Sequence, residues 1–289
     1  MKPHSIKPFP IPVVATIGPG SQADDEGLDY LPMPEGMATF RASPLPEPEL
    51  LAAHVECLRA LHQALAALRR PGASEATQVI DLAALDDGDR LLLNQVLGEG
   101  EVAAQLLGED AVRVQESVFA GVWRVIRLAG GRVQSDTLEI GSVPQLLVDA
   151  ARDDGHRARP LLDAVPDGVM NAPSLLAEID EQQHHWTDRQ PPHVINLTLL
   201  PLSAGDSAYL DNQLGAGRVL ILSRGYGNCR IVNTRLAHTW RVTYFNSTDI
   251  IILDTLEVCR VPEVGCAAAE DLEDSAERLA EVLDWVRAA

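Results

Sequence analysis

Apolar residues recur with helical spacing near both ends of the chain. After Pro48 they fall on one helical face, at Leu51, Val55, Leu58, Leu61, Leu65 and Leu68. Pro48 suits a first helical turn and Pro71-Gly72 ends the run, so the pattern predicts a helix over about 48–70. A similar apolar pattern predicts a closing helix over about 267–287.

Between these helices the chain repeats itself at an offset of 117 residues. The matching positions include Gly98/Gly215, Gly108/Gly225, Trp123/Trp240, Arg124/Arg241 and Val125/Val242. After one inserted residue, the block DTLEIGSVP at 136–144 matches DTLEVCRVP at 254–262. The period is far longer than that of a solenoid repeat, so we predict a duplicated domain.

Both copies predict the same order of elements. A short helix, which we expect Asp89 or Asp206 to cap, ends at Gly98 or Gly215. Alternating apolar runs follow, in the first copy at about 101–107, 111–118, 121–129 and 134–141. The short turns between these runs indicate an antiparallel meander. A helix precedes each copy, over 48–70 and about 173–186, and another follows it.

The predicted fold class is therefore α+β, with two tandem repeats of a two-layer sandwich. Each repeat is an antiparallel β-meander packed with helices, and an extended Pro-rich arm precedes them. We expect four segments, which are the N-terminal arm at 1–47, the first repeat at 48–153, a linker at 154–170 and the second repeat at 171–289. Prolines in the arm fix φ and remove backbone donors, which favours an extended segment.

Composition narrows the classes of partner. Hydrophobic residues make up 46% of the 289 residues, which indicates a globular protein. The 42 acidic and 23 basic residues give a net charge of −19, which repels phosphate backbones and anionic lipids. We therefore expect no nucleic-acid partner and no membrane partner, and no apolar run of about 18 residues is present. Prolines interrupt the short apolar run at the start, which is not typical of a signal peptide, so we expect a cytoplasmic protein.

The stretch SRGYGNC at 223–229 is the most distinctive polar segment. At the 117-residue offset it aligns with LLGEDAV at 106–112, and both lie between two predicted strands. The shared role is a hairpin turn that needs a residue of positive φ. The second copy adds Arg224, Tyr226 and Asn228, which a turn does not require, so we interpret them as partner contacts.

Cys229 leaves two interpretations open. Its strand position matches Val112, which favours a buried thiol that behaves as a small hydrophobe. A reactive thiolate would need a nearby cation, which Arg224 or Arg230 could supply. We include Cys229 among the candidate partner contacts, together with Gln115 and Glu116, which we expect on an exposed sheet surface.

Other patterns predict little chemistry. The spacing Cys259-x6-Cys266 and the adjacent His184 and His185 are too loose for a zinc signature. GEGEV at 98–102 lacks the lysine and hydroxyl of a phosphate-binding loop. No set of residues typical of a catalytic site assembles, so we expect no enzyme activity, no metal and no cofactor.

Several long blocks resemble the HupH/HyaF family of [NiFe]-hydrogenase accessory proteins. They include IGPGSQ, LPMPEGM, DRLLLNQVLGEGEV, QESVFAGVWRV, VMNAPSLLAEI, INLTLLPLSAGD, LGAGRVLILSRGYGNCRI and YFNSTDIIILDTLEV, spread from residue 17 to 258. The resemblance implies a cytoplasmic maturation factor that handles the iron–sulfur small-subunit precursor before export. It also implies action beside a thioredoxin-like accessory protein, and it supplies no catalytic or ligand residues.

The resemblance favours a binding protein, an assembly chaperone for a [NiFe]-hydrogenase. Two other hypotheses remain open. One is a thiol- or metal-dependent factor that inserts or repairs an iron–sulfur cluster through Cys229. The other is a scaffold that bridges other accessory proteins.

Overall fold

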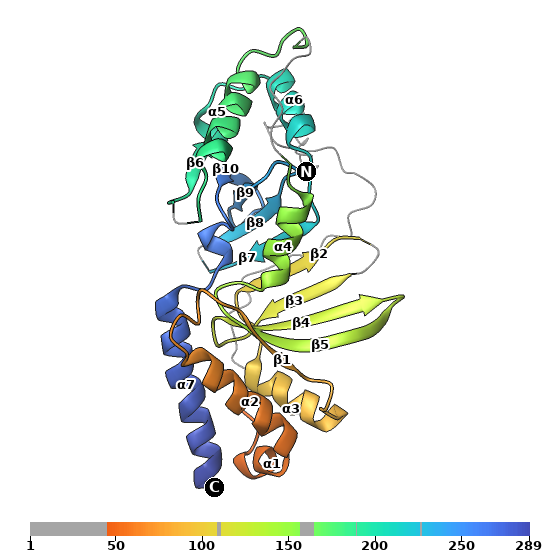
Figure 1. Cartoon of the computed structure of the whole chain (residues 1–289), viewed down its shortest axis with the longest axis vertical. Coiled ribbons are helices and arrows are strands. Elements are labelled where there is room, and N and C mark those ends of the chain that lie inside the picture. The colour runs from red at the N-terminus through yellow and green to blue at the C-terminus, as the bar shows by residue number, and fades with distance from the viewer. Residues whose placement is uncertain (1–44, 109–110, 157–164, 189, 226) are drawn as a thin grey trace, which may run out of the picture.

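The fold is described from a computed structural model, which covers residues 45–108, 111–156, 165–188, 190–225 and 227–289. The ten strands named below form one antiparallel sheet, with helices packed against it (Figure 1). The predicted α+β class is confirmed. The predicted arm at 1–47 lies almost wholly outside the described residues, as does much of the predicted linker.

The strands alternate with helices along the chain. The strands are β1 (Gln78–Asp81), β2 (Val102–Leu106), β3 (Val112–Glu116), β4 (Val122–Ala129), β5 (Arg132–Ile140), β6 (His193–Asn196), β7 (Val219–Ser223), β8 (Asn228–Asn233), β9 (Thr239–Phe245) and β10 (Ile251–Val258). The helices are α1 (Pro48–Ala53), α2 (Val55–Leu68), α3 (Asp87–Leu97), α4 (Gln145–Asp154), α5 (Ala172–His185), α6 (Ala204–Leu214) and α7 (Ala269–Ala288). Two short 3₁₀ helices, η1 (Leu197–Leu199) and η2 (Glu263–Gly265), complete the described elements.

The two halves of the chain, 45–156 and 165–289, share this single sheet. The strand order is β1-β5-β4-β3-β2-β7-β8-β9-β10-β6, so each half supplies five neighbouring strands. We had predicted two separate sandwiches. Pairing β2 with β7 instead covers two strand edges that would otherwise expose unpaired backbone groups.

The pairing of β2 with β7 is symmetric about its centre. Ala104 lies opposite Ile221, and these two residues are related by the 117-residue offset. The flanking pairs are Val102 with Ser223 and Leu106 with Val219. The same offset relates Val102 to Val219 and Leu106 to Ser223, so it converts each flanking pair into the other. This register is what two equivalent halves related by a twofold axis would produce.

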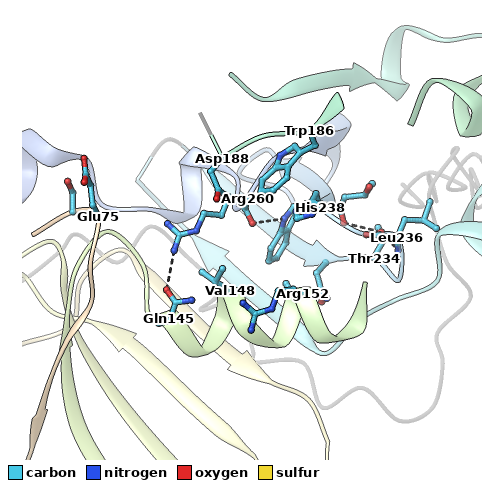
Figure 2. Close-up of a pocket in the computed structure, with 15 residues that line it drawn as sticks. Glu75, Gln145, Val148, Arg152, Trp186, Asp188, Thr234, Leu236, His238 and Arg260 are labelled. Atoms are coloured by element: carbon cyan, nitrogen blue, oxygen red, sulfur yellow. Dashed lines mark hydrogen bonds between the residues drawn. The ribbon is translucent and has the colours of Figure 1, made fainter. Parts of the chain in front are cut away.

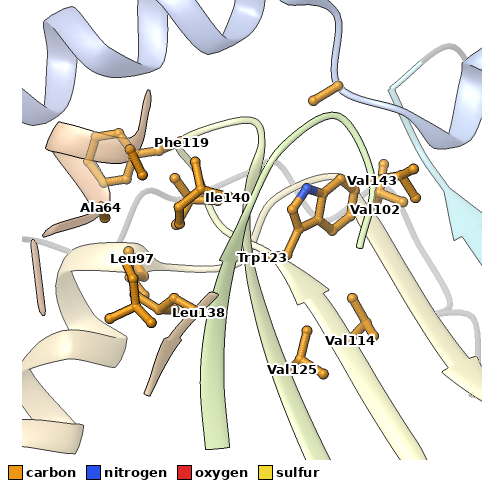
Figure 3. Close-up of a cluster of buried hydrophobic side chains, with 14 of the residues drawn as sticks. Ala64, Leu97, Val102, Val114, Phe119, Trp123, Val125, Leu138, Ile140 and Val143 are labelled. Carbon is orange, nitrogen blue, oxygen red and sulfur yellow. The ribbon is translucent and has the colours of Figure 1, made fainter. Parts of the chain in front are cut away.

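Side-chain alternation gives the sheet two buried faces (Figure 3). Trp123, Val125 and Val114 share one face, which we call the inner face. Leu138 and Ile140 point the other way, toward the helical layer of α2 and α3, and belong to the outer face. The inner face continues into the second half, where Ile221, Ile231 and Trp240 join the same core.

Equivalent ion pairs hold the outer face in each half. Arg124 donates to both carboxylate oxygens of Asp136, at 3.0 and 2.8 Å. Arg241 donates to both carboxylate oxygens of Asp254, at 3.0 and 2.7 Å. Asp136 and Asp254 are buried, so both charges need these fork-shaped contacts.

The helices that follow each set of strands pack against the opposite half. Helix α7, from the second half, lies along α1 and α2 of the first half (Figure 1). Helix α4, from the first half, contacts β7, and the backbone of His156 just beyond it bonds the carbonyl of Arg235 at 2.8 Å. Each half therefore depends on the other for part of its packing.

Local details differ from the sequence predictions in three places. The helix predicted over 48–70 breaks at His54, whose backbone is not helical. The caps of α3 and α6 are Asp86 and Ser203, while Asp89 and Asp206 lie at the third helical position and complete capping boxes. The four-residue edge strands β1 and β6 were not predicted, because runs this short carry little periodicity.

Candidate functional site

The predicted loop SRGYGNC joins β7 to β8 beside the seam between the halves. The backbone N–H of Arg224 donates to the carbonyl oxygen of Glu101 at 3.1 Å, which ties the loop to the first half. The side chain of Arg224 is exposed and that of Asn228 is half-buried. Tyr226 lies outside the described residues.

The residue of positive φ in this loop is not the glycine that the repeat predicts. The positive φ falls at Gly227, with φ 103°, and not at Gly225. Gly225 lies so close to Glu101 that a β-carbon there would overlap the carboxylate. Gly225 therefore leaves room for the side chain of Glu101 from the first half, and Gly227 provides the positive φ of the turn.

Cys229 is part of the core. Its residue is 1% exposed on the inner face, where it joins Ile221 and Ile231. Burial raises the pKa of the thiol to about 11, although a hydrogen bond from Ser223 opposes the shift. The inclusion of Cys229 among partner contacts is therefore wrong, since strand alternation turns its side chain inward.

Gln115 and Glu116 also differ from the predicted exposed surface. The amide nitrogen of Gln115 donates to backbone oxygens of Glu116 and Val102, at 3.0 and 3.3 Å. Glu116 is buried, and its Oε1 accepts the N–H of Gly121 at 3.3 Å. Burial, with smaller contributions from nearby carboxylates, raises the pKa of Glu116 to about 7.

The structure brings these predicted residues to the same end of neighbouring strands. Glu116 ends β3, Val102 begins β2, Ser223 ends β7, and Asn228 begins β8. Arg224, just beyond β7, is therefore two strands away from Gln115 and Glu116 on β3, and Asn228 on β8 is three strands away. Partner binding at Arg224 and Asn228 stays a prediction.

A cavity of about 660 Å³ lies elsewhere along the seam, between α4 and the turn that joins β8 to β9 (Figure 2). Gln145, Val148 and Arg152 of α4 form one wall. Trp186 and His238 lie above them, and Arg260 reaches across between the two layers (Figure 2). Residues from both halves thus build a single concave surface.

His238 has an unusual backbone in this cavity. Its φ is +56°, in the left-handed region that costs a residue with a β-carbon about 1 kcal/mol. Its ring stacks on Trp186 with centroids 3.6 Å apart and planes 14° apart. Burial lowers the pKa of His238, and the Asp188 carboxylate opposes the shift, so burial favours the neutral ring. Strain of this kind is concentrated at functional sites.

The first half provides an internal control for His238. At the 117-residue offset, His238 matches Gly121, whose φ is +80°. Leu272 of α7 fills the space beside Gly121, so that a β-carbon there would lie 2.6 Å from Leu272 Cδ1. The first half therefore has glycine at this position with Leu272 packed beside it, whereas the second half has the strained His238 in the wall of a cavity.

Arg260 is the second difference between the halves at this position. In the matching blocks DTLEIGSVP and DTLEVCRVP, it takes the place of Ser142. Its Nη2 donates to Gln145 Oε1 at 3.1 Å, and among the described residues it forms no ion pair. The backbone oxygen of Arg260 accepts the indole N–H of Trp240 at 3.2 Å, which fixes this segment over the cavity.

Sequence reasoning missed this cavity, although one signal was available. The repeat aligned a histidine with a glycine at a turn that requires positive φ, and we applied that comparison only to the β7–β8 loop. The contribution of Trp186 could not be found in this way, because it lies outside the matching blocks.

Potential metal donors gather elsewhere. Within the described ranges, the three-donor group is His54, Asp86 and Asp89. Asp86 and Asp89 cap α3, and His54 Nδ1 lies 2.8 Å from Asp89 Oδ1, so these groups already stabilise a helix start. His184 and His185 each bond the carbonyl oxygen four residues earlier. Cys229 has no such donor group around it in the part of the chain that the structure covers.

Of the described helices, none combines the length and the apolar character needed to cross a bilayer.

Comparison with known proteins now defines the class. A family model described as "HupH hydrogenase expression protein, C-terminal conserved region" matches residues 52–166 and again 169–286. The chain is 53% identical over 278 residues to the hydrogenase expression/formation protein HoxQ of Cupriavidus necator, covering 96% of this chain and 98% of that protein. It is 46% identical over 280 residues to the hydrogenase expression/formation protein HupH of Rhodobacter capsulatus, covering 96% and 98%.

More distant relatives match over a similar length. The hydrogenase-1 operon protein HyaF of Escherichia coli is 36% identical over 281 residues, which cover 94% of this chain and 96% of that protein. These matches define an accessory protein of hydrogenase expression and formation. The chain belongs to the HupH family of hydrogenase expression proteins.

Proposed function

We propose that this protein is an assembly chaperone for a [NiFe]-hydrogenase. It binds the iron–sulfur small-subunit precursor in the cytoplasm and protects the incompletely metallated chain until export and assembly. The observation that carries the proposal is the similarity of nearly the whole chain to proteins named for hydrogenase expression and formation. A role in hydrogenase maturation follows from the family, and the small-subunit precursor as client is our inference.

The surface of the second half supports a binding role rather than catalysis. Arg224 is exposed, and its backbone N–H donates to the carbonyl oxygen of Glu101, so its guanidinium can contact a partner from a backbone that is held at this residue. The aligned segment of the first half has no arginine. In this account a thioredoxin-like accessory protein acts beside the chaperone on the same client.

A test of the loop uses the full chain, tagged and produced in cells that express a hydrogenase. The double variant Arg224→Ala/Tyr226→Ala should lose at least about tenfold of the captured small-subunit precursor, because truncation of arginine and aromatic contacts is costly at interfaces. Its melting temperature should stay within about 2 °C of the original value, since surface substitutions usually change stability by less than 0.5 kcal/mol.

Arg132→Ala is the matched control, because Arg132 is also exposed next to a hairpin turn. It should leave capture unchanged. Full capture by the loop variant would remove this loop from the binding surface.

The alternative, cluster insertion through Cys229, has less support. A thiol with a pKa of about 11 is almost wholly protonated near neutral pH, and the thiolate is the form that binds metals. Iron assay and absorbance of the anaerobically purified protein separate the two hypotheses. Stoichiometric iron that disappears in Cys229→Ser would favour the insertion factor.

A further inference from the structure

The cavity between α4 and the β8–β9 turn is not explained by the fold alone. In the first half Leu272 packs beside the equivalent residue, Gly121, and a smaller cavity of about 370 Å³ lies nearby between α7 and the β3–β4 turn. The second half instead places a strained His238 and a cationic Arg260 there. Both residues replace smaller ones, Gly121 and Ser142, that are compatible with the same backbone.

The charged groups that line the cavity are the guanidinium groups of Arg152 and Arg260 and the carboxylates of Glu75 and Asp188. Arg260 forms no ion pair among the described residues, and one hydrogen bond to Gln145 leaves most of its guanidinium donors available. The ring nitrogens of His238 form no hydrogen bond within the described part of the chain. A neutral imidazole keeps one N–H donor, whereas the guanidinium of Arg152 already pairs with Asp149 at 2.9 Å.

The other walls suit a polypeptide. Val148 is only partly buried and offers apolar surface, and Trp186 offers an aromatic edge next to the donors. A guanidinium fork beside an imidazole donor matches a carboxylate, which accepts two hydrogen bonds from arginine in one plane.

We propose that this cavity, built around His238, Arg260 and Trp186, binds an extended peptide segment through an acidic side chain. The carboxylate lies against Arg260 and His238, and a neighbouring apolar side chain of the peptide packs against Val148. Asp188 and Glu75 at the rim disfavour peptides that carry a second acidic residue nearby. The inference deepens the proposed function, because it assigns a second contact site for the client.

The test is an array of synthetic peptides that is independent of any client. Members of each set differ only at a central position, which is aspartate, asparagine or lysine, within many different flanking sequences. The full chain should bind aspartate peptides at least about tenfold better than asparagine or lysine peptides, since a bidentate charged pair has more than the strength of one neutral bond. Equal binding of the aspartate, asparagine and lysine peptides, or a preference for lysine peptides, would overturn the proposal.

The matched variant returns both positions to the residues of the first half, His238→Gly and Arg260→Ser. It should abolish the aspartate preference while the melting temperature changes by no more than about 4 °C, because relief of strain offsets the lost stacking. Arg132→Ser should change neither quantity. Retention of the preference in the double variant would show that these residues do not form the site.

Capture of the small-subunit precursor then separates the two proposals. If the original chain captures the precursor and the double variant does so equally well, the cavity is not a client site and the proposed function stands. If the original chain captures no precursor but keeps its aspartate preference, the proposed client is wrong and the peptide site stands.

Discussion

At the scale of single residues, burial decides which of the polar groups can act. The sequence favours a buried thiol for Cys229 and an exposed position for Glu116, and the structure places both side chains on the inner face, where they are buried. Arg224 and Asn228, one or five residues beyond Ser223, retain access to solvent. Alternation along a strand separates these outcomes, and a one-residue change of register would have reversed them.

The four thiols provide a first prediction at this scale. Burial raises the pKa of Cys57 to about 12 and those of Cys229 and Cys266 to about 11, and it also raises that of Cys259. We expect native protein at pH 8 to react with a thiol reagent at less than about one hundredth of the rate of the unfolded chain, since only the thiolate attacks. One rapidly reacting equivalent that is absent from Cys229→Ser would contradict this expectation.

Glu116 gives a prediction about pH. Its pKa of about 7 lies above the ordinary 4.5, so the folded chain binds this proton more tightly than the unfolded chain. The contribution of Glu116 to the free energy of unfolding is therefore greatest below about 4.5 and falls as pH rises to about 7. Glu116→Gln keeps an oxygen for the N–H of Gly121 and removes the buried charge.

The variant should be more stable than the original chain at pH 8, by up to about 3 kcal/mol, and similar to it at pH 5. Denaturant unfolding of both proteins at the two pH values measures the difference. A gain in stability that is the same at pH 5 and pH 8 would show that ionisation of Glu116 is not its cause.

At the scale of elements, turns show where the two halves have diverged. The β3–β4 turn ends at Gly121 and the β8–β9 turn ends at His238, with positive φ at both. After each turn an equivalent bond forms, from Gly141 N to Gly121 O at 2.9 Å and from Cys259 N to His238 O at 2.8 Å. The backbone requirement is shared, so the different side chains reflect different surroundings.

Gly121→Ala tests the closed position of the first half. A β-carbon there would meet both a positive φ and Leu272, and we expect a loss of about 2–4 kcal/mol in the free energy of unfolding. Gly130→Ala is the control, because Gly130 has φ +55° but nothing within 4 Å of the added carbon. It should cost about 1 kcal/mol. Equal losses in the two variants would mean that Leu272 does not close this position.

The sequence was informative about elements with strong periodicity. The meander strands at 102–106, 112–116, 122–129 and 132–140 fall close to the predicted runs, because each alternates over a half-buried surface. The apolar pattern did not predict the break at His54, whose side chain contacts Asp89, 35 residues away in the sequence. The edge strands β1 and β6 form through pairing with β5 and β10.

At the scale of the whole molecule, the two halves cannot be treated as independent. The sheet runs through both, and α7 and α4 each pack on the half to which they do not belong in sequence (Figure 1). Local patterns cannot reveal pairing between β2 and β7, because both strands carry the same signal whether their edges meet or stay apart. The whole cavity could not be predicted from local patterns either, since residues of both halves line it. The repeat indicated only His238.

Shared packing predicts cooperative unfolding. Calorimetry should show one transition for the full chain, with equal calorimetric and van't Hoff enthalpies, because separation of the halves would expose the β2–β7 edges and the helix contacts together. Two resolved transitions would contradict the single sheet as the unit of stability.

The most direct test of the central claim is co-purification. The tagged chain is isolated from cells that produce a [NiFe]-hydrogenase, and mass spectrometry identifies what accompanies it. The account predicts enrichment of the small-subunit precursor, still carrying its export signal, over the mature subunit. Enrichment of other accessory proteins without either hydrogenase subunit would contradict the chaperone and would favour a scaffold.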